Sequence, residues 1–150
     1  MAEEELLERR AIRLAATAAD RADAIRQCGE TFVEIGATDG SYVDAMLARE
    51  RSVSTYIGEG VAIPHGTLAG KEAVRRDALA VLRFPDGVDW DGERVTVCVA
   101  IAAKGDGHVA LLAALAEILM DPDQAAELRN ATEPDQVLQL LAPMREGSAS

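Results

Sequence analysis

Residues 94–103 constrain the fold more than any other segment, because they form a run that is apolar on both faces of an extended chain. After Arg94, the only hydroxyl side chain is that of Thr96, and small or β-branched apolar residues fill the other positions. A strand without a polar face has to be covered on both sides, as in sheets that lie between two layers of helices. The segment therefore predicts a central strand of a covered sheet.

Helical periodicity before this strand predicts two of the covering helices. An apolar stripe over residues 25–35 indicates an amphipathic helix, with Thr17 or Asp20 as its N-cap and Gly36 at its end. A turn at residues 39–41 precedes a second helix, in which apolar residues recur three and four positions apart. Both helices have one apolar face, so we expect them to pack on the sheet.

The remaining elements complete an α/β pattern. Strands are predicted over residues 52–57, 60–64 and 78–84, and turn chemistry at residues 85–87 ends the last of them. A helix over residues 108–120 is apolar nearly all round, so we expect it to be buried or heavily covered. Shorter helices begin at Asp121-Pro122 and at residues 132–135. This order predicts a three-layer α/β/α sandwich with a mixed central sheet.

The length of the chain predicts a single domain. One apolar core suffices for 150 residues, and neither a repeat nor a low-complexity linker interrupts them. We expect one domain over residues 1–150, with a core at about 14–141 and termini at 1–13 and 142–150.

Composition excludes several classes of partner. The 15 Lys and Arg against 26 Asp and Glu give a net charge of −11, which argues against nucleic acid as a partner. No apolar run approaches the ~20 residues of a membrane span. Residues 3–5 are acidic where a secretory signal is basic, so we expect a cytoplasmic protein.

Cys28 and Cys98 lie within apolar patterns and are expected to be buried and unpaired.

Candidate chemistry gathers around the only two histidines. His65 follows a predicted strand and His108 begins a predicted helix, and both lie in glycine-flanked loops. Ligand sites of open α/β sheets lie beyond strand ends, which favours a joint site. In one interpretation His65 is a nucleophile that accepts a phosphoryl group on its nitrogen lone pair. Arg49 then binds phosphate oxygens, and His108 and the helix start donate N–H groups to them.

A zinc site is the alternative chemistry at these histidines. Glu59 or Asp106 would then complete the set of ligands. The two histidines lie far apart in the sequence, however, and the chain has neither an HExxH nor a CxxC motif. It also lacks the GxxxxGK[ST] phosphate loop, so we expect no metal and no other cofactor.

Two segments carry a specific family resemblance. Residues 42–50 read YVDAMLARE and residues 55–67 read TYIGEGVAIPHGT, and further similarity extends over about residues 14–141. The chain resembles the enzyme IIA domains of the mannitol/fructose branch of the bacterial phosphoenolpyruvate-dependent sugar phosphotransferase system. It is closest to the mannitol type.

The resemblance implies a function and a set of roles. The histidine at the position of His65 accepts a phosphoryl group from the carrier HPr and passes it to a cysteine of the IIB domain of a membrane permease. His108 and Arg49 match the pair that stabilises the phosphoryl group. Glu59 also matches the family pattern, with either a supporting role toward an arginine or histidine or none.

Two other functions stay open at this stage. A nitrogen-type regulatory IIA protein uses the same histidine chemistry, but other proteins read its phosphorylation state. The same fold also resembles cytoplasmic domains of anion exchangers, which bind without phosphoryl transfer. The sequence leaves the sugar and the oligomeric state open.

Overall fold

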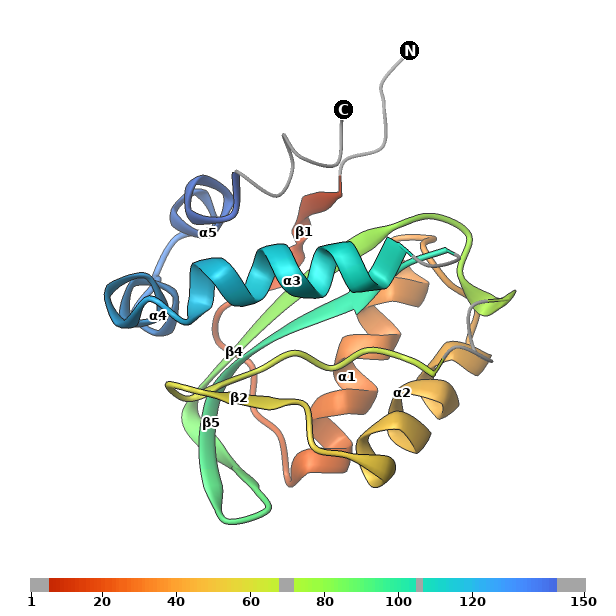
Figure 1. Ribbon diagram of the computed structural model, residues 1–150, viewed down its shortest axis with the longest axis horizontal. Helices are drawn as coiled ribbons and strands as arrows, with labels where there is room; N and C mark the ends of the chain where they lie inside the picture. Colours follow the sequence, from red (N-terminus) through yellow and green to blue (C-terminus); the bar gives the residue numbers. More distant parts are fainter. Residues whose placement is uncertain (1–5, 68–71, 105–106, 143–150) are drawn as a thin grey trace.

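The computed structural model describes residues 6–67, 72–104 and 107–142, although it does not describe the side chains of Gly107 and His108. It contains one five-stranded sheet and five helices in these regions (Figure 1). Their order along the chain is β1 (Leu7–Arg13), α1 (Arg21–Glu34), α2 (Ser41–Ser52), β2 (Tyr56–Gly58), β3 (Val61–Ala62), β4 (Ala78–Trp90), β5 (Glu93–Ala102), α3 (Gly107–Leu119), α4 (Pro122–Arg129) and α5 (Pro134–Leu140).

The sheet is mixed, with the strand order β1-β4-β5-β3-β2. β1 is parallel to β4 and β3 is parallel to β5, whereas β4 and β5 form an antiparallel hairpin and β2 is antiparallel to β3. α1 and α2 lie on one side of the sheet and α3 on the other (Figure 1). β5 lies in the middle and is buried from Val97 to Ala102. The predicted α/β sandwich with a mixed sheet is therefore confirmed.

Helix α1 begins and packs as its sequence indicates. The Asp20 carboxylate accepts a hydrogen bond from the Asp23 backbone N–H at 2.8 Å, so Asp20 is the N-cap. A Cβ added to Gly29 would lie 2.7 Å from Cγ2 of Val43, and the missing side chain thus lets α2 approach α1 closely. Cys28 of α1 and Cys98 of β5 are both free and buried, as predicted, and burial raises the pKa of the Cys98 thiol.

The long apolar helix is less covered than its sequence predicted. Leu111, Leu115 and Leu119 of α3 form a buried stripe against the sheet, but Val109 is 60% exposed. The sheet contacts only one side of this helix, and the opposite side is rich in alanine. Small side chains leave little apolar surface exposed there, so the helix does not need a complete cover.

β4 differs from its prediction because the strand does not end at residue 84. The predicted turn at residues 85–87 is wrong: β4 continues to Trp90, with an irregular register between Arg83 and Val88. Gly87 has a φ of 81°, and a Cβ there would collide with Nε of Arg94. The Pro and Gly residues form a bulge, which accommodates a proline and a positive φ inside a strand.

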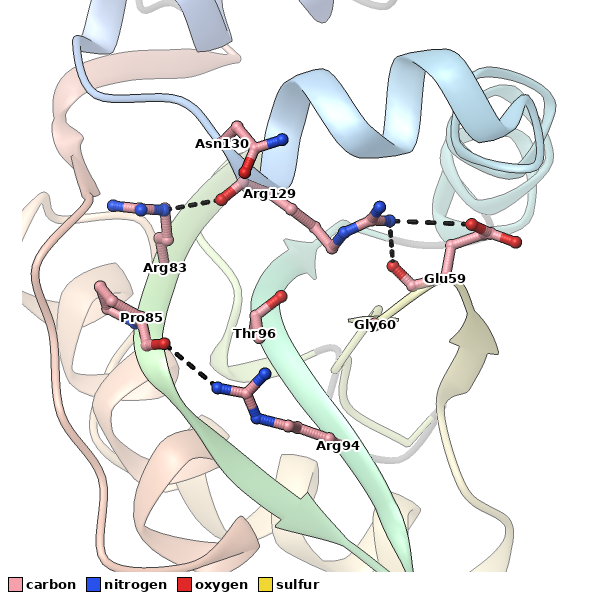
Figure 2. Close-up of a pocket in the computed structure, with 8 residues that line it drawn as sticks. All are labelled: Glu59, Gly60, Arg83, Pro85, Arg94, Thr96, Arg129 and Asn130. Carbon is pink, nitrogen blue, oxygen red and sulfur yellow. Dashed lines mark hydrogen bonds and ion pairs between the residues drawn. The ribbon is translucent and has the colours of Figure 1, made fainter.

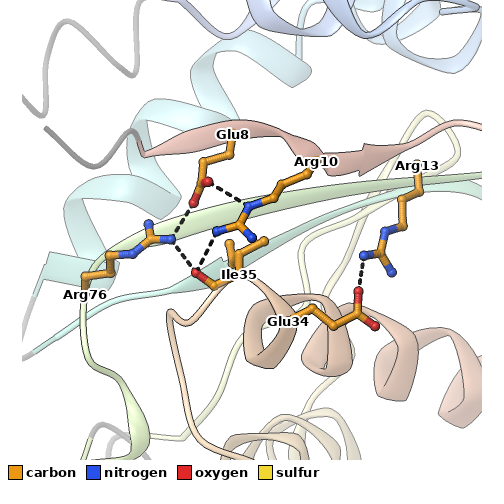
Figure 3. Close-up of polar contacts among 6 residues, drawn as sticks. All are labelled: Glu8, Arg10, Arg13, Glu34, Ile35 and Arg76. Carbon is orange, nitrogen blue, oxygen red and sulfur yellow. Dashed lines mark hydrogen bonds and ion pairs between the residues drawn. The ribbon is translucent and has the colours of Figure 1, made fainter. Parts of the chain in front are cut away.

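β1 is an edge strand within the residues that the sequence left as a terminus. Polar contacts attach it to the end of α1 (Figure 3). Glu8 accepts hydrogen bonds from Arg10, at 3.0 Å, and from Arg76, and Arg76 also donates to the Ile35 carbonyl at 2.9 Å. Burial raises the pKa of Glu8, but the two arginines outweigh it and hold that pKa below its ordinary value. Arg13 pairs with Glu34 beside them.

Candidate functional site

His65 lies just beyond β3, where the chain crosses the end of the central strand. It forms an isolated parallel bridge with Ile101 of β5, whose N–H donates to the Pro64 carbonyl at 2.9 Å. The side chain is buried, and its Nδ1 lies 2.9 Å from the Ile63 carbonyl oxygen. A carbonyl only accepts, so Nδ1 carries the hydrogen in this bond. In the neutral ring the lone pair is therefore on Nε2.

Tyr42 of α2 holds the residue after His65. Its hydroxyl donates to the Ile101 carbonyl at 2.9 Å and accepts from the Gly66 N–H at 2.9 Å. Burial raises the pKa of Tyr42 to about 12, despite the opposing effect of the hydrogen bond from Gly66, so the hydroxyl stays protonated at neutral pH. A Cβ on Gly66 would lie 2.5 Å from the tyrosine ring. Tyr42 thus fixes His65 from the start of α2.

A buried carboxylate holds the other end of α2. Glu50 accepts hydrogen bonds from the backbone N–H of Thr55 at 3.0 Å, from its hydroxyl at 2.5 Å and from Nε1 of Trp90 at 3.0 Å. The Thr55 carbonyl in turn accepts from the Ile63 N–H at 3.0 Å. Three donors from the protein replace the water that an ionised carboxylate requires. Both ends of α2 are therefore attached to the segment that leads to His65.

Arg49 lies in the last turn of α2, next to this carboxylate. It is half-buried, and its NH1 donates to the Val53 carbonyl at 2.6 Å. One bond to a backbone carbonyl uses only part of the five N–H donors of a guanidinium. The structure thus places Arg49 on the helix that is attached to the His65 segment, and its role toward phosphate stays a prediction.

His108 is the second residue of α3, which follows β5. Because Ile101 of β5 forms the bridge with His65, α3 begins a few residues after that bridge. The side chain of His108 and the whole of Asp106 lie outside the described residues. For this part of the predicted site, the structure therefore describes only the backbone at the start of α3.

Glu59 has its described contacts elsewhere. It lies in the β2–β3 turn with a φ of 57°, and it precedes β3 whereas His65 follows it. Its carbonyl accepts from Arg129 NH1 at 2.6 Å, and its carboxylate lies 3.7 Å from the same atom (Figure 2). Among the described residues, the partner of Glu59 is thus Arg129 of α4. A supporting role of Glu59 in the candidate site stays a prediction.

Tyr42 and Glu50 are positioning residues that sequence reasoning missed. Both lie inside the YVDAMLARE segment, but neither received a role. Two features of the sequence could have pointed to them. One is the charged Glu50 at a helix end before an apolar strand, and the other is the glycine directly after His65. Neither signal names the partner, because Ile101 and Trp90 are distant in sequence.

The structure does not test the zinc alternative, because the side chain of His108 and the whole of Asp106 lie outside the described residues. Residues 6–67, 72–104 and 107–142, leaving out the side chains of Gly107 and His108, contain no group of three or more His, Cys, Asp or Glu side chains that could hold a metal ion. Within the same ranges, none of the helices combines the length and apolar character of a membrane span.

A family model described as "Phosphoenolpyruvate-dependent sugar phosphotransferase system, EIIA 2" matches residues 5–143. The chain belongs to the EIIA 2 family. The family predicted from the segments at residues 42–50 and 55–67 is therefore confirmed.

Two relatives of this EIIA 2 chain differ in how much of their own length the chain covers. It is 37% identical over 141 residues to the mannitol-specific phosphotransferase enzyme IIA component of Halalkalibacterium halodurans, with 94% of this chain and 97% of the relative covered. It is 41% identical over 125 residues to the multiphosphoryl transfer protein of Escherichia coli O157:H7. That match covers 83% of this chain, which spans only 33% of the relative.

Solved structures agree with the EIIA 2 fold. A complex of enzyme IIA and phosphorylated enzyme IIB for mannitol from Escherichia coli contains a chain that matches with a TM-score of 0.84 and 34% identity, over 92% of this chain and 99% of that one. The nitrogen regulatory protein IIA-Ntr from Neisseria meningitidis matches with a TM-score of 0.77 but 22% identity, over 91% and 96% of the two chains. The second likeness shows the fold alone.

Proposed function

We propose that this chain is the IIA phosphoryl carrier of a mannitol-type sugar uptake system. His65 accepts the group from the phosphohistidine of HPr and passes it to a cysteine of a IIB domain in the cytoplasm. The observation that carries the proposal is the Nδ1 hydrogen bond of His65 to the Ile63 carbonyl, because it leaves the lone pair on Nε2. All described elements pack as one unit, which supports a single IIA domain over residues 1–150.

The transfer needs no base on the protein. The Nε2 lone pair forms a bond to phosphorus, the P–N bond of the donor breaks, and the donor ring nitrogen takes back its electron pair. The His65 ring then carries a positive charge and keeps its hydrogen on Nδ1, where the Ile63 carbonyl accepts it. A thiolate of IIB reverses these roles: its sulfur attacks phosphorus and the Nε2–P bond breaks.

Positioning and charge supply the rate enhancement. In this proposal the Arg49 guanidinium binds phosphoryl oxygens with the donors that Val53 does not use. His108 and the N-terminus of α3 donate further N–H groups to them. Tyr42 and Glu50 act through position alone, because they hold α2 against the segment that carries His65.

The mannitol type is supported by the relative that the chain matches over nearly its whole length, which is named mannitol-specific. A IIB acceptor is supported by the solved complex with phosphorylated IIB. HPr as the donor rests on the family resemblance. No described contact favours a nitrogen-type regulatory role, and the acceptor assay below separates the two.

Phosphorylation with purified partners tests the proposal. The chain is incubated with labelled phosphoenolpyruvate, enzyme I and HPr, and we expect an acid-labile phosphate on His65 that a mannitol-type IIB then removes. His65→Ala should take no label, whereas Arg26→Gln on the exposed face of α1 should take it at the wild-type rate. Full histidine labelling of His65→Ala, or a labelled chain that no IIB discharges, would refute the carrier assignment.

A further inference from the structure

A pocket of about 510 Å³ lies between the middle of the sheet, the β2–β3 turn and the end of α4 (Figure 2). Arg83 of β4, Arg94 of β5 and Arg129 of α4 line it, and Glu59 is the only carboxylate among the described residues that line it. The chain as a whole has a net charge of −11. The pocket therefore reverses the sign of the surrounding charge, which is the electrostatic condition for binding an anion.

The arginines in this pocket are held mainly by uncharged partners. Arg83 donates to the carbonyls of Arg129 at 2.8 Å and Leu14 at 2.9 Å, and Arg94 donates to the Pro85 carbonyl at 3.3 Å. Carbonyl oxygens accept hydrogen bonds but carry no net charge. Within the described residues, the one ion pair of these three arginines is the 3.7 Å contact between Arg129 and Glu59. Most of their positive charge is therefore uncompensated.

Thr96 places a buried hydroxyl at the same pocket. Its Oγ1 has almost no exposed surface and no hydrogen-bond partner among residues 6–67, 72–104 and 107–142. Burying a hydroxyl without a partner costs about 1–3 kcal/mol, so such groups are normally satisfied by protein, water or ligand. An anion oxygen accepts from a hydroxyl, and one in this pocket would satisfy Thr96 once the neighbouring Arg129 side chain turns toward the anion and uncovers Oγ1.

Gly60 lets the side chains of Arg129 and Thr96 lie close to the backbone at the wall of the pocket. Its φ is 76°, and a Cβ there would lie 3.1 Å from Cδ of Arg129 and 3.3 Å from Oγ1 of Thr96. A side chain at this position would press against both of them, so the glycine keeps Arg129 and Thr96 in place at the pocket. The bulge of β4 at residues 85–87 lies on the other side, where Pro85 lines the pocket.

We propose that this pocket is a binding site for the phosphoryl group of a small organic phosphate or for free phosphate. Guanidinium groups match phosphate oxygens in geometry and charge, and the Thr96 hydroxyl adds an uncharged donor. The volume lies in the range of small-molecule sites and exceeds what a lone phosphate needs. The site is separate from His65, because the β2–β3 turn and His65 lie at opposite ends of β3. The ligand binds there without transfer of its group.

Titration of the full chain with two probes tests the site. Inorganic phosphate and glucose 6-phosphate are added at constant ionic strength to a His65→Ala background, which removes the proposed transfer site. Backbone amide shifts of Gly60 and Thr96 report binding. We expect millimolar dissociation constants, weakened about tenfold by Arg94→Gln or Arg129→Gln and about threefold by Thr96→Val. Arg83 is not varied, because its bonds to Leu14 and Arg129 hold the fold together.

Matched variants separate a built site from general charge. Arg26→Gln removes the same charge from an exposed position on α1 and should leave both dissociation constants unchanged. Glu59→Gln removes the pocket carboxylate and should tighten binding several-fold. Tighter binding of glucose 6-phosphate identifies an organic phosphate, and equal binding identifies free phosphate. Absence of amide shifts at Gly60 and Thr96, or an equal loss with Arg26→Gln and Arg94→Gln, overturns the proposal.

Discussion

Gly66 donates its backbone N–H to the Tyr42 hydroxyl at 2.9 Å, and the two residues are so close that a Cβ on Gly66 would lie 2.5 Å from Cε1 of the ring. Gly66→Ala therefore forces either the tyrosine ring or the backbone next to His65 to move. We expect the free energy of unfolding to fall by about 1–3 kcal/mol, the usual cost of overpacking. Urea denaturation measures this loss, and phosphorylation of His65 should slow with it.

Gly40→Ala is the matched control for this prediction. Gly40 has a φ of −66° and no atom within 4 Å of an added Cβ, so a methyl group there meets neither strain nor a neighbour. Its stability should stay within about 0.5 kcal/mol of the wild type. Equal stabilities for the two glycine variants would mean that the contact with Tyr42 does not constrain the His65 segment.

Tyr42→Phe removes both hydrogen bonds of the hydroxyl and should destabilise the protein at neutral pH. The Ile101 carbonyl and the Gly66 N–H lose their partner, and unsatisfied buried groups of this kind cost about 1–3 kcal/mol. The ring itself stays in place, so the core remains filled. Thermal or urea unfolding of the two proteins gives the difference, and identical curves would contradict it.

The same tyrosine predicts a loss of stability in alkali. Burial raises the pKa of Tyr42 from an ordinary value of 10.0 to about 12. Between these two values the unfolded chain has released the proton and the native chain still holds it, so the native state loses stability as the pH rises. The loss should reach about 2–3 kcal/mol by pH 12. Tyr42→Phe lacks this group, so its unfolding free energy should fall less over the same window.

Glu50→Gln should destabilise the end of α2. The carboxylate accepts from Trp90 Nε1 and twice from Thr55, whereas an amide presents N–H groups to at least one of these donors. We expect a loss of about 1–3 kcal/mol in urea denaturation. Trp90→Phe removes one donor of the network and should lower the cost of Glu50→Gln in the double variant. Strict additivity would mean that the two residues are not coupled.

The sequence predicted the helices and the central strand well, because their signals are local. The Asp20 cap, the apolar stripe of α1 and the two-faced run of β5 depend on residues that are neighbours in the chain. β1 and the bulge at residues 85–87 were missed because their structure depends on a distant partner strand. β1 has polar residues in its middle and gains its place by pairing with β4. Pro85 and Gly87 are typical turn residues, and only the pairing of β4 with β5 shows that the strand continues through them.

For the candidate site, the sequence could name reactive residues but not the residues that hold them. His65 stood out through residue type and position after a strand. Tyr42 and Glu50 act through Ile101 and Trp90, and only the fold brings these pairs together. Glu59 matched a sequence pattern, yet its described contacts are with Arg129. The sequence pattern thus identified the segment around His65, whereas contacts between residues distant in sequence determine which side chains hold it.

Arg49→Ala should slow phosphorylation of His65 by about 10²–10³, the usual effect of losing one donor that stabilises transferring charge. Arg49→Lys keeps the charge but loses the planar fork, so it should restore only part of the rate. The bond to the Val53 carbonyl is also lost in both variants, so stability is measured separately by urea denaturation. Arg51→Ala, which removes an exposed arginine from the same helix, should label at the wild-type rate. Wild-type labelling of a fully folded Arg49→Ala would show that the arginine only caps the end of α2.

His108→Ala should slow phosphorylation by the same factor as Arg49→Ala. Because both side chains would act on the same phosphoryl group, the double variant should lose less than the product of the two single effects.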